Sequence, residues 1–167
     1  MPKVSVSAES QNSTFGRPLC ITLPNSLKDA IKTVQARGTL VKLAIGGDEW
    51  GNTYVTTKTK HNADWAISEI IDHVEELGLD GIDLVQQEGF GYDNMNAQDQ
   101  SSLHLYVVHE FRKRMPTKLI TYTFPGDSTK LNFPFRDVLE YGHEYLNTIN
   151  VFRATSSTIG NVLFLST

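Results

Sequence analysis

One short segment gathers residue types that could carry acid-base chemistry. It runs from Asp80 to Glu88 and reads DGIDLVQQE. Two carboxyl groups on one side of such a segment could serve as general acid and general base. The side chains of a strand alternate between two faces, so Asp83 shares a face with Val85 and Gln87, whereas Glu88 belongs to the other face. The face of Asp83 therefore carries a single carboxylate.

Residues suited to contact a ligand stand in or after predicted strands. Gly46 and Gly47 end one apolar run, and glycine lets the backbone approach a ligand closely. Trp50 follows them, Tyr92 lies in a polar loop and Tyr122 lies in a later apolar run. Aromatic rings offer flat apolar faces on which a ligand can stack. We expect these five residues to bind substrate, although the two glycines would also suit a plain strand-to-loop turn.

Composition excludes several classes of protein. The chain has 167 residues, is 40% hydrophobic and carries a formal net charge of −4, which suits one globular domain. The acidic balance argues against nucleic-acid and membrane partners, because both would need a positive surface. The basic run Arg112-Lys113-Arg114 is expected to close a helix. The single cysteine, Cys20, and the histidine spacing indicate no metal site, and no cofactor motif is present.

The sequence alternates short apolar runs with amphipathic stretches, which is typical of βα units and a parallel sheet. A closed barrel of eight such units needs about 250 residues. We therefore expect an incomplete barrel, with a doubly wound open sheet as the alternative. The four clear strands are predicted at Leu40–Ile45, Leu79–Val85, Lys118–Phe124 and Thr148–Phe152, and a weaker one at Lys3–Val6.

Four helices are predicted between these strands from their apolar stripes and their glycine or proline ends. They span Asn25–Arg37, Asn62–Leu77, Ala97–Arg114 and a segment from Pro134 to Leu146. Trp65, near the start of the second helix, is expected to pack in the core.

The order of these motifs resembles glycoside hydrolase family 18, the chitinases and chitinase-like proteins. The segment VKLAIGG looks like the Ser-x-Gly-Gly motif of the third family strand, and LGLDGIDLVQQE looks like the Asp-Gly-x-Asp-x-Asp-x-Glu motif of the fourth. KLITYTFPG and YLNTINVFRAT look like the fifth and sixth strands. The resemblance covers most of the chain and implies a partial (β/α)8 TIM barrel of roughly units two to six, with parallel strands and outer helices. Residues 1–167 would then form one domain, in which 1–24 have no clear place.

The resemblance implies a mechanism that this sequence does not carry. Family members cleave β-1,4 bonds between N-acetylglucosamine units, with the substrate's acetamido oxygen as nucleophile. The Glu that protonates the leaving oxygen corresponds to Gln87, and the Asp that supports the acetamido group corresponds to Val85. A glutamine amide cannot deliver that proton. The motif's Ser is Ala44, and the Tyr and Asp of the sixth strand are Ala154 and Thr155.

These substitutions predict a chitinase-like carbohydrate-binding protein without hydrolytic activity. One alternative is an active chitinase or endo-N-acetylglucosaminidase that uses Glu88, which would require a bulge to turn this residue inward. Another is a structural module or a gene fragment without a ligand. Asp80 is expected to serve the turn into the strand, and Asp83 to accept hydrogen bonds from a hydroxyl or a backbone amide.

The partners expected are chitin-type oligosaccharides and, through the open edges of the barrel, a second copy of the chain. The given sequence shows no signal peptide and no apolar run long enough to span a bilayer, so we expect a soluble chain. The family is commonly secreted, and the sequence does not assign a location.

Overall fold

The computed structural model describes residues 25–46, 60–85, 97–125, 133–152, 154–155, 158–159 and 163–166. Strands and helices alternate along these residues, as the sequence predicts. The helices are α1 (Asn25–Gln35), α3 (Lys60–Leu77), α4 (Ala97–Arg114) and α5 (Phe133–Tyr141), with a 3-10 turn η2 (His143–Tyr145). The strands are β1 (Lys42–Gly46), β2 (Gly81–Val85), β3 (Leu119–Pro125), β4 (Thr148–Phe152), β5 (Ala154–Thr155), β6 (Thr158–Ile159) and β7 (Leu163–Ser166). The weaker strand predicted at Lys3–Val6 lies outside the described residues.

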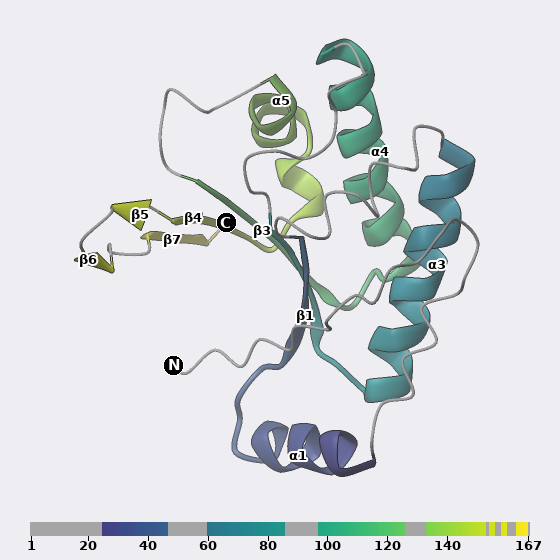
Figure 1. Ribbon diagram of the computed structural model, residues 1–167, viewed down its shortest axis with the longest axis vertical. Helices are drawn as coiled ribbons and strands as arrows, with labels where there is room; N and C mark the ends of the chain where they lie inside the picture. The colour runs from purple at the N-terminus through teal and green to yellow at the C-terminus, as the bar shows by residue number, and fades with distance from the viewer. Residues whose placement is uncertain are drawn as a thin grey trace.

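Four parallel strands form the centre of the sheet, in the order β1-β2-β3-β4. Each strand lies beside the next one along the chain, which is the arrangement of successive units of a (β/α)8 barrel. Figure 1 shows α3 and α4 together on one side of this sheet. The fold is therefore the predicted α/β partial barrel.

The last strand departs from the all-parallel arrangement that the sequence predicts. β7 pairs antiparallel with β4, from Thr148 opposite Ser166 to Val151 opposite Leu163. The short strands β5 and β6 pair with each other in a separate two-stranded sheet. The chain thus turns back on β4, where a further barrel unit would have added a parallel strand.

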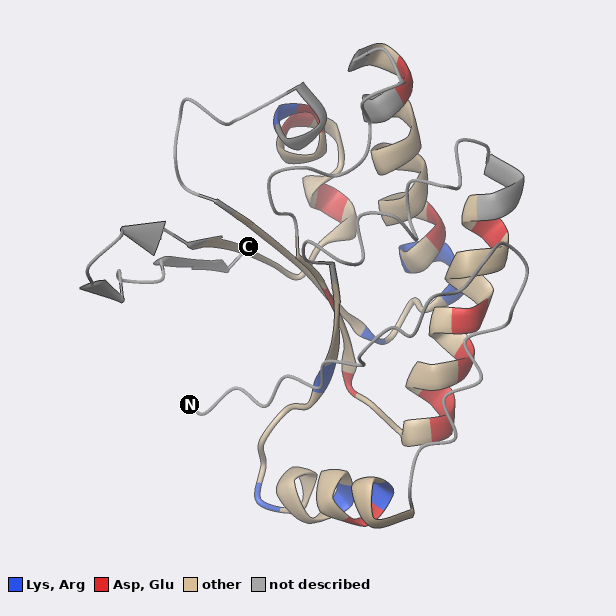
Figure 2. Cartoon of the chain, viewed as in Figure 1, with Lys and Arg blue, Asp and Glu red and all other residues tan. Residues whose placement is uncertain are grey.

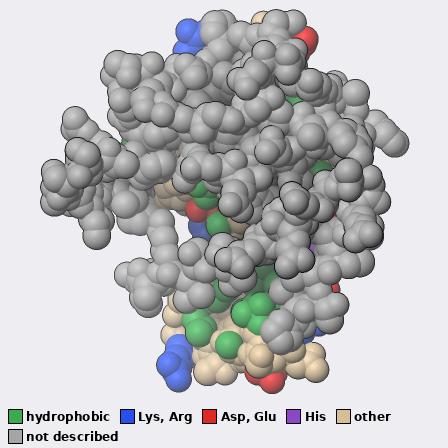
Figure 3. Space-filling view, in the orientation of Figure 1, with side chains coloured by type: hydrophobic (Ala, Val, Ile, Leu, Met, Phe, Trp, Pro, Cys, Tyr) green, Lys and Arg blue, Asp and Glu red, His purple; other side chains and the backbone are tan. Residues whose placement is uncertain are grey.

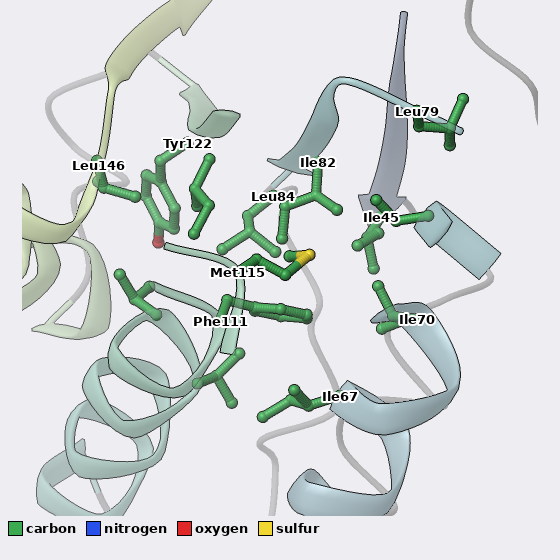
Figure 4. Packing of buried hydrophobic residues seen from close by; sticks show 14 of the residues in the cluster. Ile45, Ile67, Ile70, Leu79, Ile82, Leu84, Phe111, Met115, Tyr122 and Leu146 are labelled. Atoms are coloured by element: carbon green, nitrogen blue, oxygen red, sulfur yellow. The ribbon is translucent and has the colours of Figure 1, made fainter. Parts of the chain in front are cut away.

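The hydrophobic core lies between the sheet and the helices. The alternate side chains Ile82 and Leu84 of β2 point into it and are 0% and 3% exposed. Figure 4 shows them facing Phe111 of α4 and Ile67 of α3. The helices bury the stripes that the sequence predicts, including Ile67, Ile70, Val74 and Leu77 of α3. Burial of these side chains fixes which face of each strand turns away from the helices, because strand side chains alternate.

Three details of the helices refine the predictions. Gly38 and Gly78 follow α1 and α3 with φ of +78° and +64°, the left-handed conformation expected of glycines that end helices. The fourth helix ends at Tyr141 rather than at Leu146, and η2 follows it. The prediction that Trp65 packs in the core is wrong, since its side chain lies beside the buried stripe of α3 and is 45% exposed. None of the described helices is long and apolar enough to cross a membrane.

Arg112, near the end of α4, joins three parts of the fold. Its Nε donates to the carbonyl oxygen of Tyr145 at 2.9 Å, and its Nη2 donates to Asn147 Oδ1 at 2.6 Å. Its Nη1 reaches three further carbonyl oxygens, those of Met115, Pro116 and Lys118. The basic run therefore closes α4 as predicted, and it also anchors the segments that lead into β3 and β4.

Replacing Arg112 should destabilise the protein strongly. Arg112→Met leaves several carbonyl oxygens without their donor, and we expect the free energy of unfolding to fall by about 3 kcal/mol in urea titrations. Arg37→Met removes an exposed arginine after α1 and serves as the control. Equal urea midpoints for the two variants would contradict the role of Arg112.

Burial of His104 should make stability depend on pH. His104 is 7% exposed, and its burial lowers its pKa to about 4 from the ordinary value of 6.5. The unfolded chain therefore binds a proton below pH 6.5 that the folded chain resists. Stability is present above pH 6.5 and is lost as the pH falls toward 4, by about 3 kcal/mol between pH 7 and pH 4. His104→Leu should remove this part of the pH dependence in urea titrations; an unchanged pH profile would contradict the assignment.

Candidate functional site

The candidate site is the polar face of the sheet, which we define as the side turned away from the helices and carrying Lys42, Asp83, Thr121, Thr123 and Asn150. Lys42 of β1 and Asp83 of β2 are the charged residues of the described strands. Figure 2 shows that most other charged residues of the described part lie on the helices. Figure 3 shows a basic and an acidic side chain next to each other near the centre of that view, with hydrophobic ones around them. A charge placed on a strand needs a partner, because water is scarce there.

Register explains why these five residues share a face. Asp83 is opposite Thr121, and Thr123 is opposite Asn150. Lys42 is opposite Gly81, which has no side chain to block a long one reaching across β2. Residues opposite each other in parallel strands point to the same side, so the five side chains come from four adjacent strands and meet over β2 and β3.

A chain of hydrogen bonds converges on one oxygen of Asp83. Thr121 Oγ1 and Thr123 Oγ1 lie 2.7 Å and 2.8 Å from Asp83 Oδ1. Lys42 Nζ donates to Thr121 Oγ1 at 2.7 Å, and Asn150 Nδ2 donates to Thr123 Oγ1 at 3.0 Å. An ammonium group and an amide nitrogen can only donate, so each threonine hydroxyl passes its own proton on to the carboxylate. Asp83 thus receives two donors that are themselves polarised, one of them by a positive charge. The predicted bond from a hydroxyl to Asp83 is confirmed.

Asp80 serves the entry into β2, as the sequence predicts. Its Oδ2 accepts the backbone amide of Val41 at 2.7 Å and the side-chain amide of Gln35 at 3.0 Å. Its backbone amide donates to the carbonyl oxygen of Val41, and its carbonyl oxygen accepts from Leu119. A Cβ atom on the next residue, Gly81, would overlap the carbonyl oxygen of Leu119, so only glycine fits between these strands. Asp80 therefore lies at the amino end of β2 and ties three segments together.

The described carboxyl end of β2 offers apolar residues beside Asp83 and no acid-base pair. Val85 is the last residue of β2, two positions after Asp83 and on the same face. Ala44 is opposite Asp83 in β1 and offers no hydroxyl. Within the described part of this face, Asp83 is the one carboxyl group, and its Oδ1 is already taken by two hydroxyls. The described face can orient hydroxyl and amide groups, and it offers no second carboxyl group for acid-base catalysis.

The structure places one predicted sugar-binding residue in the core. Tyr122 of β3 is 1% exposed, and Figure 4 shows its ring on the helix side of the sheet near Leu146. Burial raises the pKa of its hydroxyl well above the ordinary value. The prediction that Tyr122 contacts a ligand is therefore corrected, because alternation along β3 assigns the opposite face to Thr121 and Thr123. Gly46 ends β1 at the carboxyl edge of the sheet, whereas the other predicted residues lie outside the described residues: Gly47, Trp50, Tyr92, Gln87 and Glu88.

Sequence reasoning missed four members of the polar face, namely Lys42, Thr121, Thr123 and Asn150. A signal for them exists. Each is a polar residue that alternates with apolar ones inside a run interpreted as a buried strand. The alternation of side chains in all four strands, combined with the alternation around Asp83, assigns them to the face of that carboxylate.

The described residues contain no group of three or more His, Cys, Asp or Glu side chains that could hold a metal ion.

Solved structures with this arrangement include several chitinases. A family 18 glycoside hydrolase, a chitinase from Pseudoalteromonas aurantia, matches at a TM-score of 0.61 with 20% identity, over 74% of this chain and 47% of that one. Catalytic domain 2 of the Group II chitinase of Ostrinia furnacalis, a mutant in complex with (NAG)5, matches at 0.58 with 17% identity, over 76% and 35%. A class V chitinase mutant from Cycas revoluta in complex with (GlcNAc)3 matches at 0.55 with 16% identity, over 76% and 40%.

The comparisons show the fold of this chain. It has the chitinase-like fold of glycoside hydrolase family 18 and spans less than half of the length of each of these three chitinases. No protein-family model matches the sequence.

The hydrogen-bonded chain from Lys42 through Thr121 to Asp83 should be measurable as a coupling energy between the two charged residues. In a double-mutant cycle of Lys42→Met and Asp83→Asn, we expect a coupling of about 1 kcal/mol in urea unfolding, since the two charges share Thr121. The coupling should shrink in a Thr121→Val background. The exposed pair Lys28–Glu76, whose charged groups touch directly at 2.7 Å, is the control and should couple more weakly because water screens it. A coupling energy that Thr121→Val leaves unchanged would contradict the connection of Lys42 to Asp83 through Thr121.

Proposed function

We propose that this chain binds chitin-type oligosaccharides on the polar face of its sheet and does not hydrolyse them. The observation that carries the proposal is the hydrogen-bonded set Lys42, Thr121, Asp83, Thr123 and Asn150, a group of donors and acceptors whose two charges balance. Asp83, Thr123 and Asn150 each lie two residues before the carboxyl end of their strand. Ligands of parallel α/β folds bind at those ends. Sugars present hydroxyl and amide groups, which such a surface can pair.

The fold supports the choice of sugar. Two of the solved chitinases with this fold are complexes with (NAG)5 and (GlcNAc)3. One positive and one negative charge on the described part of the face balance each other, which favours a neutral ligand over an ionic one.

Two residues support the lack of hydrolysis. Val85 stands on the face of Asp83 where the family resemblance expects a second carboxylate, and valine cannot stabilise a cationic intermediate. Gln87, at the position of the acid, cannot donate a proton to a leaving oxygen. An active glycosidase would depend on Glu88. Because strand side chains alternate, the position of Glu88 in the sequence assigns it to the face opposite that of Asp83.

Calorimetric titration with the N-acetylglucosamine tetramer tests the binding. We expect saturable binding that weakens about tenfold in Trp50→Ala, because an aromatic ring stacked on a sugar contributes about 1 kcal/mol beyond its buried area. Trp65→Ala is the matched control, since Trp65 is an exposed tryptophan on α3. A folded wild-type chain that shows no saturable binding would refute the proposal.

Turnover of a chromogenic chitobioside tests the alternative that the chain is an active glycosidase that uses Glu88. We expect none from the wild type. Turnover that disappears in Glu88→Gln would show an active glycosidase.

A further inference from the structure

Asn150 ends the hydrogen-bonded chain with an acceptor that has no donor among the described residues. Its side chain is 2% exposed, and its Nδ2 donates to Thr123 Oγ1 at 3.0 Å. Its Oδ1 is buried and accepts no hydrogen bond from the part of the chain that the structure describes. Buried polar atoms in folded proteins are nearly always paired, so an unpaired one calls for a physical reason.

The orientation of this amide follows from its neighbours. Thr123 has one hydroxyl proton, and Asp83 Oδ1 takes it at 2.8 Å. The hydroxyl oxygen can then only accept, so Asn150 must turn its Nδ2 toward Thr123 and its Oδ1 away. A flipped amide would bring two acceptors together, since its oxygen would face an oxygen without a free proton. The hydrogen bonds that begin at Asp83 therefore fix Oδ1 as a buried acceptor turned away from Thr123.

This arrangement costs the fold stability. An apolar residue of similar size would avoid a buried acceptor without a donor, and it would leave the bond from Thr123 to Asp83 in place. The strand neighbours Ile149 and Val151 show that β4 accepts branched apolar residues on its other face. Residues that lower stability in this way are typical of binding sites, where the missing partner is the ligand.

We propose that Asn150 Oδ1 accepts a hydrogen bond from an uncharged N–H or O–H group of the bound oligosaccharide. The inference rests on the proposed function and names the contact that completes the polar face. The acetamido N–H and the ring hydroxyls of N-acetylglucosamine are both donors of this class. Because Asn150 is shielded from water, a single hydrogen bond there contributes more than it would at the surface.

Asn150→Leu tests the inference through two readouts of opposite sign. We expect a melting temperature equal to or above that of the wild type, together with at least tenfold weaker binding of the N-acetylglucosamine tetramer in calorimetry. Thr148→Val, two residues earlier on the same face of β4, is the matched control and should bind as the wild type does. Asn150→Val, which is smaller and β-branched, replaces the leucine variant if that one does not fold.

Cellotetraose, which has the hydroxyls but lacks the acetamido groups, distinguishes the two donors. Wild-type binding of cellotetraose that weakens in Asn150→Leu assigns the contact to a hydroxyl. Dependence on Asn150 for the acetylated tetramer alone assigns it to the acetamido N–H.

Unchanged tetramer affinity in Asn150→Leu would overturn the inference while the proposed function stands. A lowered melting temperature beside that unchanged affinity would show that Asn150 Oδ1 serves the fold through a buried water. A wild-type chain that binds no tetramer would overturn the proposed function itself, and the ligand contact with it.

Discussion

The carboxylate of Asp83 is the constraint on which the polar face depends. It sits in the middle of a parallel sheet, where a charge is tolerated only with donors around it. β3 supplies two threonine hydroxyls to a single oxygen of Asp83. Lys42 of β1 and Asn150 of β4 donate to those hydroxyls. The placement of Lys42, the two threonines and Asn150 therefore follows from one charge, and so does the direction of every hydrogen bond between them.

The same alternation of side chains divides the sheet into two faces. On the helix side, residues such as Ile82 and Leu84 build the core that holds the fold together. On the other side, the residues between them carry the polar face. Asp80 and Arg112 hold the strand ends in place without using the polar face. Asp80 accepts hydrogen bonds from Gln35 of α1 and from the backbone amide of Val41 before β1, and Arg112 of α4 donates to carbonyl oxygens before β3 and β4. A face of this kind can change its chemistry without loss of the fold, and the presence of Val85 and Ala44 beside Asp83 is consistent with that separation.

The elements of the fold and the face of the sheet that carries the site could be predicted from the sequence, whereas the contacts within the site could not. Apolar runs and helix-ending glycines such as Gly38 and Gly78 are local signals, and they gave four strands and four helices close to their observed bounds. The partners of Asp83 depend on the register between strands, which no local pattern contains. Tyr122 shows the consequence: its aromatic ring suggested a ligand contact, yet its place in the alternation of β3 puts it in the core. The prediction for Trp65 was wrong in the opposite sense. It was expected in the core, yet the periodicity of α3 leaves it outside the buried stripe.

The most direct test is an NMR titration of the labelled chain with the N-acetylglucosamine tetramer, in which protein and sugar signals are followed in the same sample. Binding without hydrolysis predicts that the shifted resonances gather on the residues of β1 to β4 that form the polar face, while the anomeric signals of the tetramer keep their intensities for days. Shifts confined to other parts of the chain, or the growth of reducing-end signals from shorter sugars, would contradict it.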